Sequence, residues 1–318
     1  MLRVGSLLCL FLLLAAQALL AQVAAPSLLP LNPMLAVNND VDTDGPEIGA
    51  GFVTLNPAAM QWSGYSLIGA GGLEGSEKRE GADPIDQNST GSFYGVRGVW
   101  EYLSLAAEGV NFESGKSAAR ITMDTVNVAL AGQAWDWIAL GASQSNITAR
   151  FTSGGVTLGK FDSVINTVGT SLRIGEYFYV GAASGEEFLH APEEAVRPVK
   201  SYGVAFRNEG ELRMHLEYYK NDKDPLDFGN GPDSEEHSGT GVLELGWGSF
   251  VLGYRLFDRD RDEAGVNKKF VGATASVGWV SQSGLAILLH GHRGTSTQGA
   301  GSDPLNNEYQ AVSVAWAF

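Results

Sequence analysis

Cysteine is almost absent from this chain: Cys9 is the single one among 318 residues. It lies in an apolar run from Val4 to Leu20, which follows Arg3 and precedes a stretch of small residues. A basic start, an apolar core and small residues predict a secretory signal peptide, residues 1–21. The exported chain would then contain no cysteine, which excludes a disulfide framework.

Long hydrophobic runs are also absent beyond this N-terminal one. The first run is long enough to remain as an uncleaved membrane helix, although no positively charged stop follows it. No later run reaches the ~18 residues that a membrane helix needs. If the exported chain crosses a membrane, it must therefore do so as a closed barrel, because hydrocarbon offers no partners to unpaired backbone groups.

Basic residues are few: the chain has 21 Lys and Arg against 36 Asp and Glu. Without Arg3 of the signal peptide, 20 basic residues remain and the net charge is −16. Proteins that bind nucleic acid need a basic face, so this balance excludes a nucleic-acid partner.

Catalytic or metal-binding constellations are missing as well. His290 and His292 could suggest a metal pair, but residues of a polar inner face are the simpler interpretation. The acidic residues of 221–237 match no calcium-binding spacing. We therefore expect no enzyme activity, no cofactor and no metal site.

What the sequence has in abundance is alternation of apolar and polar or small residues over short segments. In the last segment, 309–318, Val312, Val314, Trp316 and Phe318 alternate with small residues. Side chains alternate across a strand with period two, and ~9–11 residues suffice to cross a bilayer as a tilted strand. We expect strands at 63–74, 91–102, 103–112, 119–132, 136–151, 164–174, 176–187, 200–208, 210–220, 238–247, 249–258, 268–280, 284–295 and 307–318.

The connections between these segments alternate between very short turns and longer polar stretches. This pattern is typical of an up-and-down outer-membrane barrel with both termini on the short-turn side. The fold prediction is all-β: a transmembrane barrel of about 14 antiparallel strands over residues 63–318. The longer connections are predicted at 75–90, 113–118, 152–163, 188–199, 221–237, 259–267 and 296–306.

Aromatic residues favour the same fold, because amphipathic rings collect at the two membrane interfaces. All seven tryptophans lie at short-turn ends of the predicted strands: Trp62, Trp100, Trp135, Trp137, Trp247, Trp279 and Trp316. A second girdle is predicted at the opposite ends from Tyr94, Phe112, Tyr202, Tyr218, Phe270 and Tyr309.

Charged residues that alternate with the outward apolar side chains of a strand are expected to face inward and line the lumen. They are either a lattice of salt bridges that braces the barrel or a polar constriction, and the sequence does not separate the two. The predicted lumen-lining residues are Arg97, Glu108, Arg173, Arg213, His215, Glu217, Glu244 and Arg255.

Residues 22–62 show no strand alternation, contain five prolines and carry an acidic patch at 38–44. They end in Asn56-Pro57-Ala58, just before the first strand. An Asn-Pro-Ala triplet in this position resembles the FadL family, the outer-membrane transporters of long-chain fatty acids and aromatic hydrocarbons. The resemblance implies a fourteen-stranded barrel in which residues 22–62 form a hatch inside the lumen.

The outer connections 152–163 and 188–199 are shorter than those that build the docking groove in that family. Phe151, Phe161, Phe188 and Leu189 are the large apolar residues left for such a role.

Three functions remain open: a gated transporter of small hydrophobic molecules, a general diffusion porin for small polar solutes, and a structural or adhesive surface barrel. The expected location is the bacterial outer membrane. The expected partners are outer-membrane lipids and lipopolysaccharide, the barrel-assembly machinery, and a small hydrophobic ligand.

The aromatic end of the chain, Trp316 to Phe318, is predicted to be the signal that the assembly machinery recognises. Deleting Phe318 should therefore lower the folded, heat-modifiable fraction in the outer membrane, measured by gel mobility without boiling. An unchanged folded yield would contradict this role.

Overall fold

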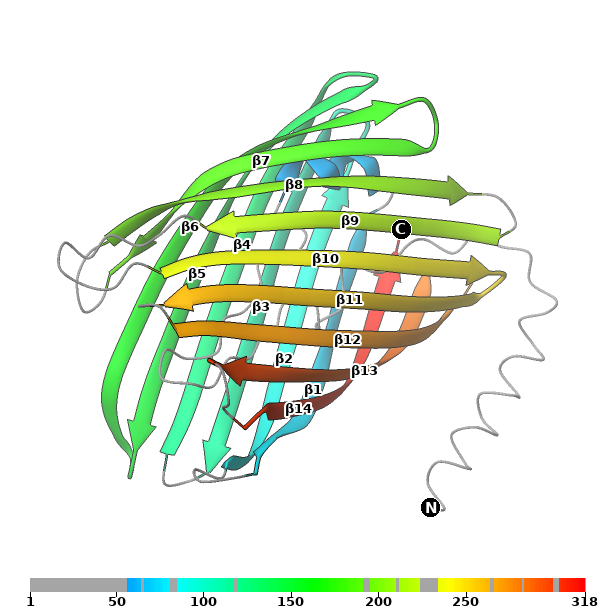
Figure 1. The fold of residues 1–318 in the computed structure, drawn as a ribbon. Helices are drawn as coiled ribbons and strands as arrows, with labels where there is room; N and C mark the ends of the chain where they lie inside the picture. Colours follow the sequence, from blue (N-terminus) through cyan, green and yellow to red (C-terminus); the bar gives the residue numbers. More distant parts are fainter. Residues whose placement is uncertain are drawn as a thin grey trace, which may run out of the picture.

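The computed structural model describes residues 56–63, 66–80, 85–116, 119–190, 195–209, 212–223, 234–263, 266–281, 283–299 and 303–317. Within them, fourteen antiparallel strands form a closed barrel in which chain neighbours pair and β1 pairs with β14 (Figure 1). The predicted up-and-down barrel is confirmed. Its strands are β1 Leu67–Arg79, β2 Ile85–Val99, β3 Leu103–Lys116, β4 Ala119–Trp135, β5 Ile138–Ser153, β6 Val156–Ile174, β7 Phe178–Leu189, β8 Ala195–Glu209, β9 Leu212–Lys223, β10 Ser234–Trp247, β11 Phe250–Glu263, β12 Val266–Val280, β13 Leu285–Gln298 and β14 Leu305–Ala317.

The two faces of each strand differ as period two requires. On β4, Val126 and Val128 are exposed on the outside, while Asn127 and Ala129 between and after them are buried on the inside. An outer face of exposed apolar side chains around a closed barrel matches hydrocarbon lipid. None of the helices among the described residues is long and apolar enough to span a membrane.

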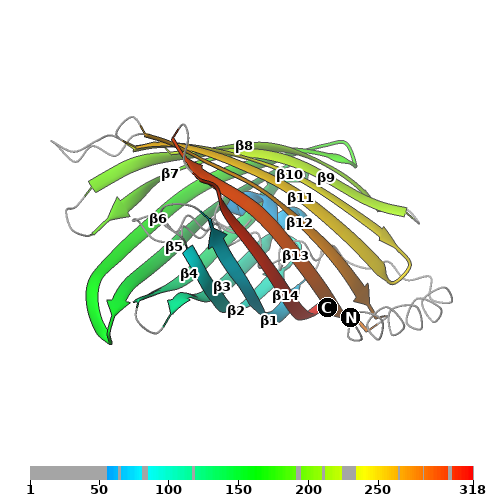
Figure 2. The same cartoon turned by 60° about the horizontal axis from the view of Figure 1, so that its bottom comes forward.

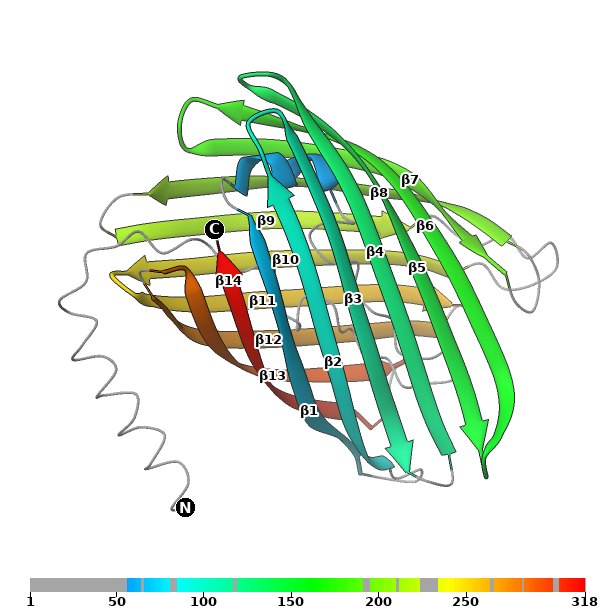
Figure 3. The ribbon, with the colours of Figure 1, turned by 180° about the vertical axis from the view of Figure 1, so that it is seen from behind.

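The barrel is flattened into two walls. In Figure 1, β7–β12 run across the front, and β2–β5 lie behind them at a steep angle. Figure 2, turned to bring the bottom forward, and Figure 3, from behind, show the same two walls. The lumen lies between them.

The predicted outer loops were too long, because the strands continue into most of them. The connections on that side cover only 80–84, 117–118, 154–155, 190–194, 224–233, 264–265 and 299–304. Outside the bilayer the side chains of a hairpin can be polar on both faces, so its hydrophobic pattern ends before its hydrogen-bonded ladder does. The predicted signal peptide, 1–21, and residues 22–55 of the predicted hatch lie outside the described residues.

The tryptophan prediction needs one correction. Trp100, Trp135, Trp137, Trp247 and Trp316 are exposed on the outer face, and Trp279 is half-buried on that face. Trp62 instead lies inside the barrel, where its indole nitrogen donates a hydrogen bond to the Ser171 hydroxyl at 3.0 Å. It precedes β1 rather than belonging to a strand, so strand parity did not apply to it.

Half of the predicted second girdle also faces inward. Tyr94, Tyr202 and Tyr218 are exposed outside, but Phe112, Phe270 and Tyr309 are buried inside the barrel. Inward-facing glycines make room for two of these rings. A Cβ on Gly75 would lie 2.2 Å from the Tyr309 ring, and one on Gly294 would lie 2.7 Å from the Phe270 ring.

Single-tryptophan variants test this arrangement. Trp100, Trp247 and Trp316 should report one common depth to lipid-borne quenchers, because all three lie at short-turn ends on the lipid-facing side. Trp62 should be shielded from the same quenchers. Depth-dependent fluorescence quenching in bilayers measures both, and widely separated depths for Trp100 and Trp247 would contradict the barrel.

Candidate functional site

The first described residues, 56–63, lie inside the barrel at its short-turn end, and we call them the luminal segment. Residues Pro57–Ser63 form a 3-10 helix that packs mainly against β4, β5 and β6. The amide nitrogen of Asn56 donates to the Thr170 carbonyl oxygen at 3.1 Å. The amide oxygen of Asn56 accepts from the backbone N–H of Ala58 at 3.2 Å. Asn56 thus fixes both the wall contact and the first turn of the helix.

Three inward-facing glycines on neighbouring strands form the seat of this segment. A Cβ on Gly141 of β5 would lie 2.5 Å from the backbone nitrogen of Ala58. A Cβ on Gly169 or Gly181 would lie 2.4 or 2.3 Å from the side-chain amide of Asn56. Only glycine permits so close an approach, so the wall is shaped to receive the Asn-Pro-Ala triplet.

The luminal segment reaches both walls. On one side, Gln61 donates to the carbonyl oxygen of Trp100 at 3.0 Å and accepts from the Ser104 hydroxyl at 2.6 Å. On the other, the Arg207 guanidinium of β8 donates to the Trp62 carbonyl oxygen at 2.8 Å. The segment therefore ties β3 to β8 across the short-turn end of the lumen.

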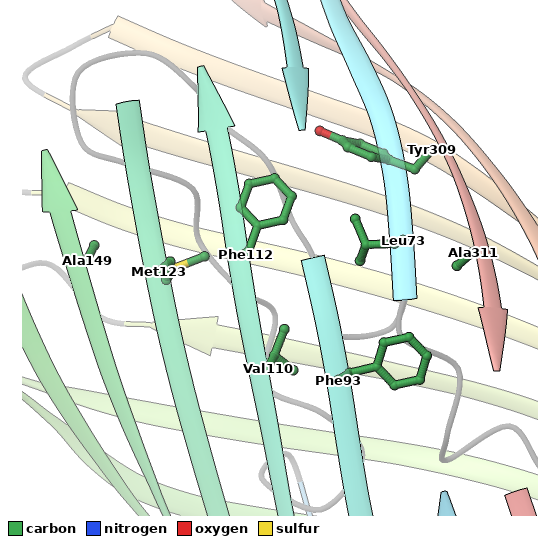
Figure 4. Packing of buried hydrophobic residues seen from close by; sticks show 8 residues of the cluster. All are labelled: Leu73, Phe93, Val110, Phe112, Met123, Ala149, Tyr309 and Ala311. Atoms are coloured by element: carbon green, nitrogen blue, oxygen red, sulfur yellow. The ribbon is translucent and has the colours of Figure 1, made fainter. Parts of the chain in front are cut away.

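Further along the lumen, one wall carries a buried apolar cluster, which we call the apolar wall. Figure 4 shows its side chains projecting inward from β1–β5 and β14, with the opposite wall behind them. Phe112 and Tyr309 meet edge to face with ring centroids 6.4 Å apart. The apolar wall consists of Leu73, Phe93, Val110, Phe112, Met123, Ala149, Tyr309 and Ala311.

Aromatic rings continue from this wall across the next strands. His292 lies 5.8 Å from Tyr309 and 6.3 Å from Phe270 between ring centroids, and Phe270 lies 5.4 Å from Phe257. The Arg255 guanidinium stands 5.5 Å from the Phe257 ring centroid. The apolar inner surface thus extends from β14 to β11, where it ends at the Arg255 guanidinium.

The eight predicted lumen-lining residues all lie at inward positions of their strands. Glu108 faces Asn127 across β3 and β4, one strand from Arg97. His215 and Glu217 are 3.2 Å apart, and Arg255 donates to the Tyr219 hydroxyl at 3.1 Å. Arg173 and Arg213 lie nearer the short turns, where each donates to a turn carbonyl, that of Asp136 and Gly248 respectively.

The two histidines of β13 also face inward. His290 lies between the Ser276 and Ser313 hydroxyls at 2.9 and 3.0 Å, and His292 lies 2.9 Å from the Thr274 hydroxyl. Among the described residues, no group of three or more His, Cys, Asp or Glu is placed to hold a metal ion.

The four residues predicted for outer-loop docking lie on strands instead, because the strands extend past the predicted loop bounds. Phe151 is on β5, Phe161 on β6, and Phe188 and Leu189 end β7. Leu189 is buried at an inward position, whereas Phe188 is at an outward one. Because successive side chains of a strand point to opposite faces, Phe188 and Leu189 do not line the same groove. The Phe161 side chain and the assembly residue Phe318 lie outside the description; Trp316 is exposed near the end of β14.

The apolar wall was not predicted from the sequence, and two of its three aromatic members, Phe112 and Tyr309, were predicted to belong to the second girdle instead. The sequence held a partial signal: Phe93 and Tyr309 lie against inward glycines one strand away, at Gly71 and Gly75. The outward ring of Tyr94 lies against Gly109 in the same way, so a glycine on the next strand indicates a flat-lying ring but not the face on which it lies.

Comparison of sequences finds no matching family model and no matching curated protein. Comparison of folds gives, among other matches, two FadL-type channels, which confirms the predicted resemblance at the level of fold. "CymD monoaromatic hydrocarbon channel" has a TM-score of 0.54 and 9% identity, covering 84% of this chain and 98% of its own. "TodX monoaromatic hydrocarbon channel deltaS2 mutant" has a TM-score of 0.52 and 8% identity, covering 82% and 92%.

The glycine seat can be tested with Gly141→Ala. The added methyl must displace the backbone at Pro57 and Ala58, so we expect a loss of about 1–3 kcal/mol in barrel stability. The control is Gly241→Ala on β10, where an added Cβ meets nothing within 4 Å. The midpoint of heat-induced unfolding in detergent measures both, and equal midpoints for the two variants would contradict the seat.

Proposed function

We propose that this barrel is a channel of the bacterial outer membrane for passive uptake of small hydrophobic molecules, such as fatty acids or aromatic hydrocarbons. The observation that carries the proposal is the apolar wall inside the lumen. A pore for hydrated solutes gains nothing from burying Phe112, Met123 and Phe93 on its inner face. These side chains are buried, so an apolar solute that enters must insert among them, and the apolar contacts that it then gains favour its transfer from water.

The fold shared with two hydrocarbon channels supports the proposal, since both take aromatic hydrocarbons according to their descriptions. The outward apolar band and closed even-numbered barrel support the outer-membrane location. We further propose that residues 1–21 are the removed signal peptide and that 22–62 form a hatch within the barrel of 63–318. The position of Asn56 supports this, because its hydrogen bond to the Thr170 carbonyl oxygen attaches the end of the proposed hatch to the inner wall.

A general diffusion porin is the second candidate, because the wall opposite the apolar one carries many charged side chains. It predicts a large steady conductance from the intact protein. A hatch-filled channel predicts little conductance until the hatch is removed.

The two candidates separate in one set of measurements. The intact protein should conduct little in planar bilayers, a variant without residues 22–55 should form a stable pore, and cells carrying the intact protein should take up toluene faster than cells without it. Phe112→Gln should lower toluene uptake several-fold, since it places an amide in the apolar wall, while Phe112→Leu keeps the wall apolar and serves as the control. Large conductance from the intact protein, together with toluene uptake that is the same for both variants, would support the porin instead.

A further inference from the structure

A single amide side chain lies at the outer end of the apolar wall. Asn307 of β14 is two residues before Tyr309, faces inward like it, and is fully buried. In the barrel register it lies between Glu77 of β1 and Gly294 of β13. A Cβ on Gly294 would lie 2.4 Å from the Asn307 amide oxygen and 2.7 Å from the Phe270 ring. The amide therefore lies over this glycine, with an aromatic ring beside it.

Three rings lie around this amide. Phe270 and His292 stack with ring planes 9° apart and centroids 6.3 Å apart, and the Tyr309 centroid lies 5.8 Å from that of His292. We call these three rings together with Asn307 the amide site. Most ligand sites combine an apolar lining with a few polar groups that fix the orientation of the ligand, and the amide site has this composition.

The hydrogen-bonding capacity of Asn307 is largely unused. An asparagine side chain offers two N–H donors and two oxygen lone pairs. His292 is the polar side chain within reach of this amide, and no other group in the described part of the chain bonds to either of its atoms. Buried polar groups are nearly always hydrogen-bonded in folded proteins, because an unsatisfied one destabilises the fold. A mostly unsatisfied amide inside an apolar surface therefore indicates a role in binding a ligand.

Charges of both signs flank the amide site. The fully buried Glu77 carboxylate accepts hydrogen bonds from the Tyr309 hydroxyl and the Gln87 amide. On the other side, the Arg255 guanidinium acts electrostatically on His292. A solute anion would be repelled by Glu77 and a solute cation by Arg255. The site therefore favours a neutral solute.

His292 gives access to the amide. It is partly exposed toward the lumen, whereas Phe270, Asn307 and Tyr309 are buried. Its imidazole is held by the Thr274 hydroxyl at 2.9 Å. A solute in the lumen can reach Asn307 by displacing this one ring, without any change in the strands. The hydrogen bonds that the solute makes with the amide compensate for those that the imidazole loses.

We propose that Asn307 determines the specificity of this lumen by binding the hydroxyl group of neutral hydroxylated aromatic solutes, the phenols, whose ring packs against Phe270 and Tyr309. This rests on the proposed function and narrows its substrate class from apolar molecules in general. A phenolic hydroxyl donates one hydrogen bond and accepts another, so it matches both the oxygen and the nitrogen of the amide. A methyl group in its place leaves the amide unsatisfied, which is how a hydrogen-bonding site rejects an analogue that lacks the hydroxyl.

A pair of solutes that differ only in hydroxyl and methyl tests this role. The dissociation constants of para-fluorophenol and para-fluorotoluene are measured by fluorine NMR on the full-length protein in detergent, with protein-free micelles as the blank. Asn307→Leu should lower the preference for the phenol, the ratio of the two constants, about tenfold, which corresponds to about one hydrogen bond. The matched control is Asn306→Leu on the outer face, which loses only the bond from the Thr295 hydroxyl and should keep the intact ratio. An unchanged ratio in Asn307→Leu, or an equal fall in both variants, overturns the proposal.

Thermal unfolding separates ligand binding from a structural role. Asn307→Leu replaces an unsatisfied buried amide with an apolar side chain of similar size, so the unfolding midpoint should not fall. A structural amide predicts the opposite, a lower midpoint with an unchanged ratio of dissociation constants. Asn307→Ala repeats the comparison with a smaller side chain. Failure of both variants to fold would show a structural role and overturn the proposal.

The outcomes also separate the amide site from the proposed function, because binding is measured without transport. A preference for the phenol that depends on Asn307, without faster uptake of toluene or para-cresol by cells, would keep the site and remove the channel. Faster toluene uptake together with a preference that Asn307→Leu leaves unchanged would do the reverse.

Discussion

Closure of the sheet is the constraint on which the rest of this structure depends. In hydrocarbon an unpaired backbone N–H or C=O costs several kcal/mol, so β1 must pair with β14 along its length. It does so from Leu67, opposite Ala317, to Arg79, opposite Leu305. Once the ring is closed in this register, each residue must face either lipid or lumen. The apolar outer face and the apolar wall inside are both consequences of that forced alternation.

The forced alternation also decides what the sequence could predict. Faces were predictable where one side of a strand is apolar and the other charged, as for Leu243, Glu244 and Leu245 on β10. Strand ends were not, because beyond the bilayer polar residues occupy both faces while the ladder continues. The inward position of Phe270 and Tyr309 was obscured for a related reason. An aromatic ring near a strand end suits a membrane interface and a packed lumen equally well. Glycines on neighbouring strands do not separate the two cases, because Gly75 accommodates the inward ring of Tyr309 and Gly109 the outward ring of Tyr94.

The luminal segment shows a different limit on what can be predicted from the sequence. The Asn-Pro-Ala triplet marked residues 56–58 as special, and an asparagine that bonds the wall could be expected there. Its seat could not be predicted, because Gly141, Gly169 and Gly181 belong to three strands and become neighbours only through the barrel register. Glycine is frequent in this chain, with 41 in all, so no single glycine stands out in the sequence. Long-range pairing turns three ordinary glycines into one site.

The apolar and the charged parts of the inner surface meet on one strand. Phe112 and Met123 pack in the apolar wall, whereas Arg259 and Arg261 face inward from β11. Phe257, which continues the aromatic rings from the apolar wall, lies on β11 as well, two residues before Arg259. A substitution on β11 therefore changes the apolar and the charged surface together, whereas one at Met123 changes the apolar wall alone.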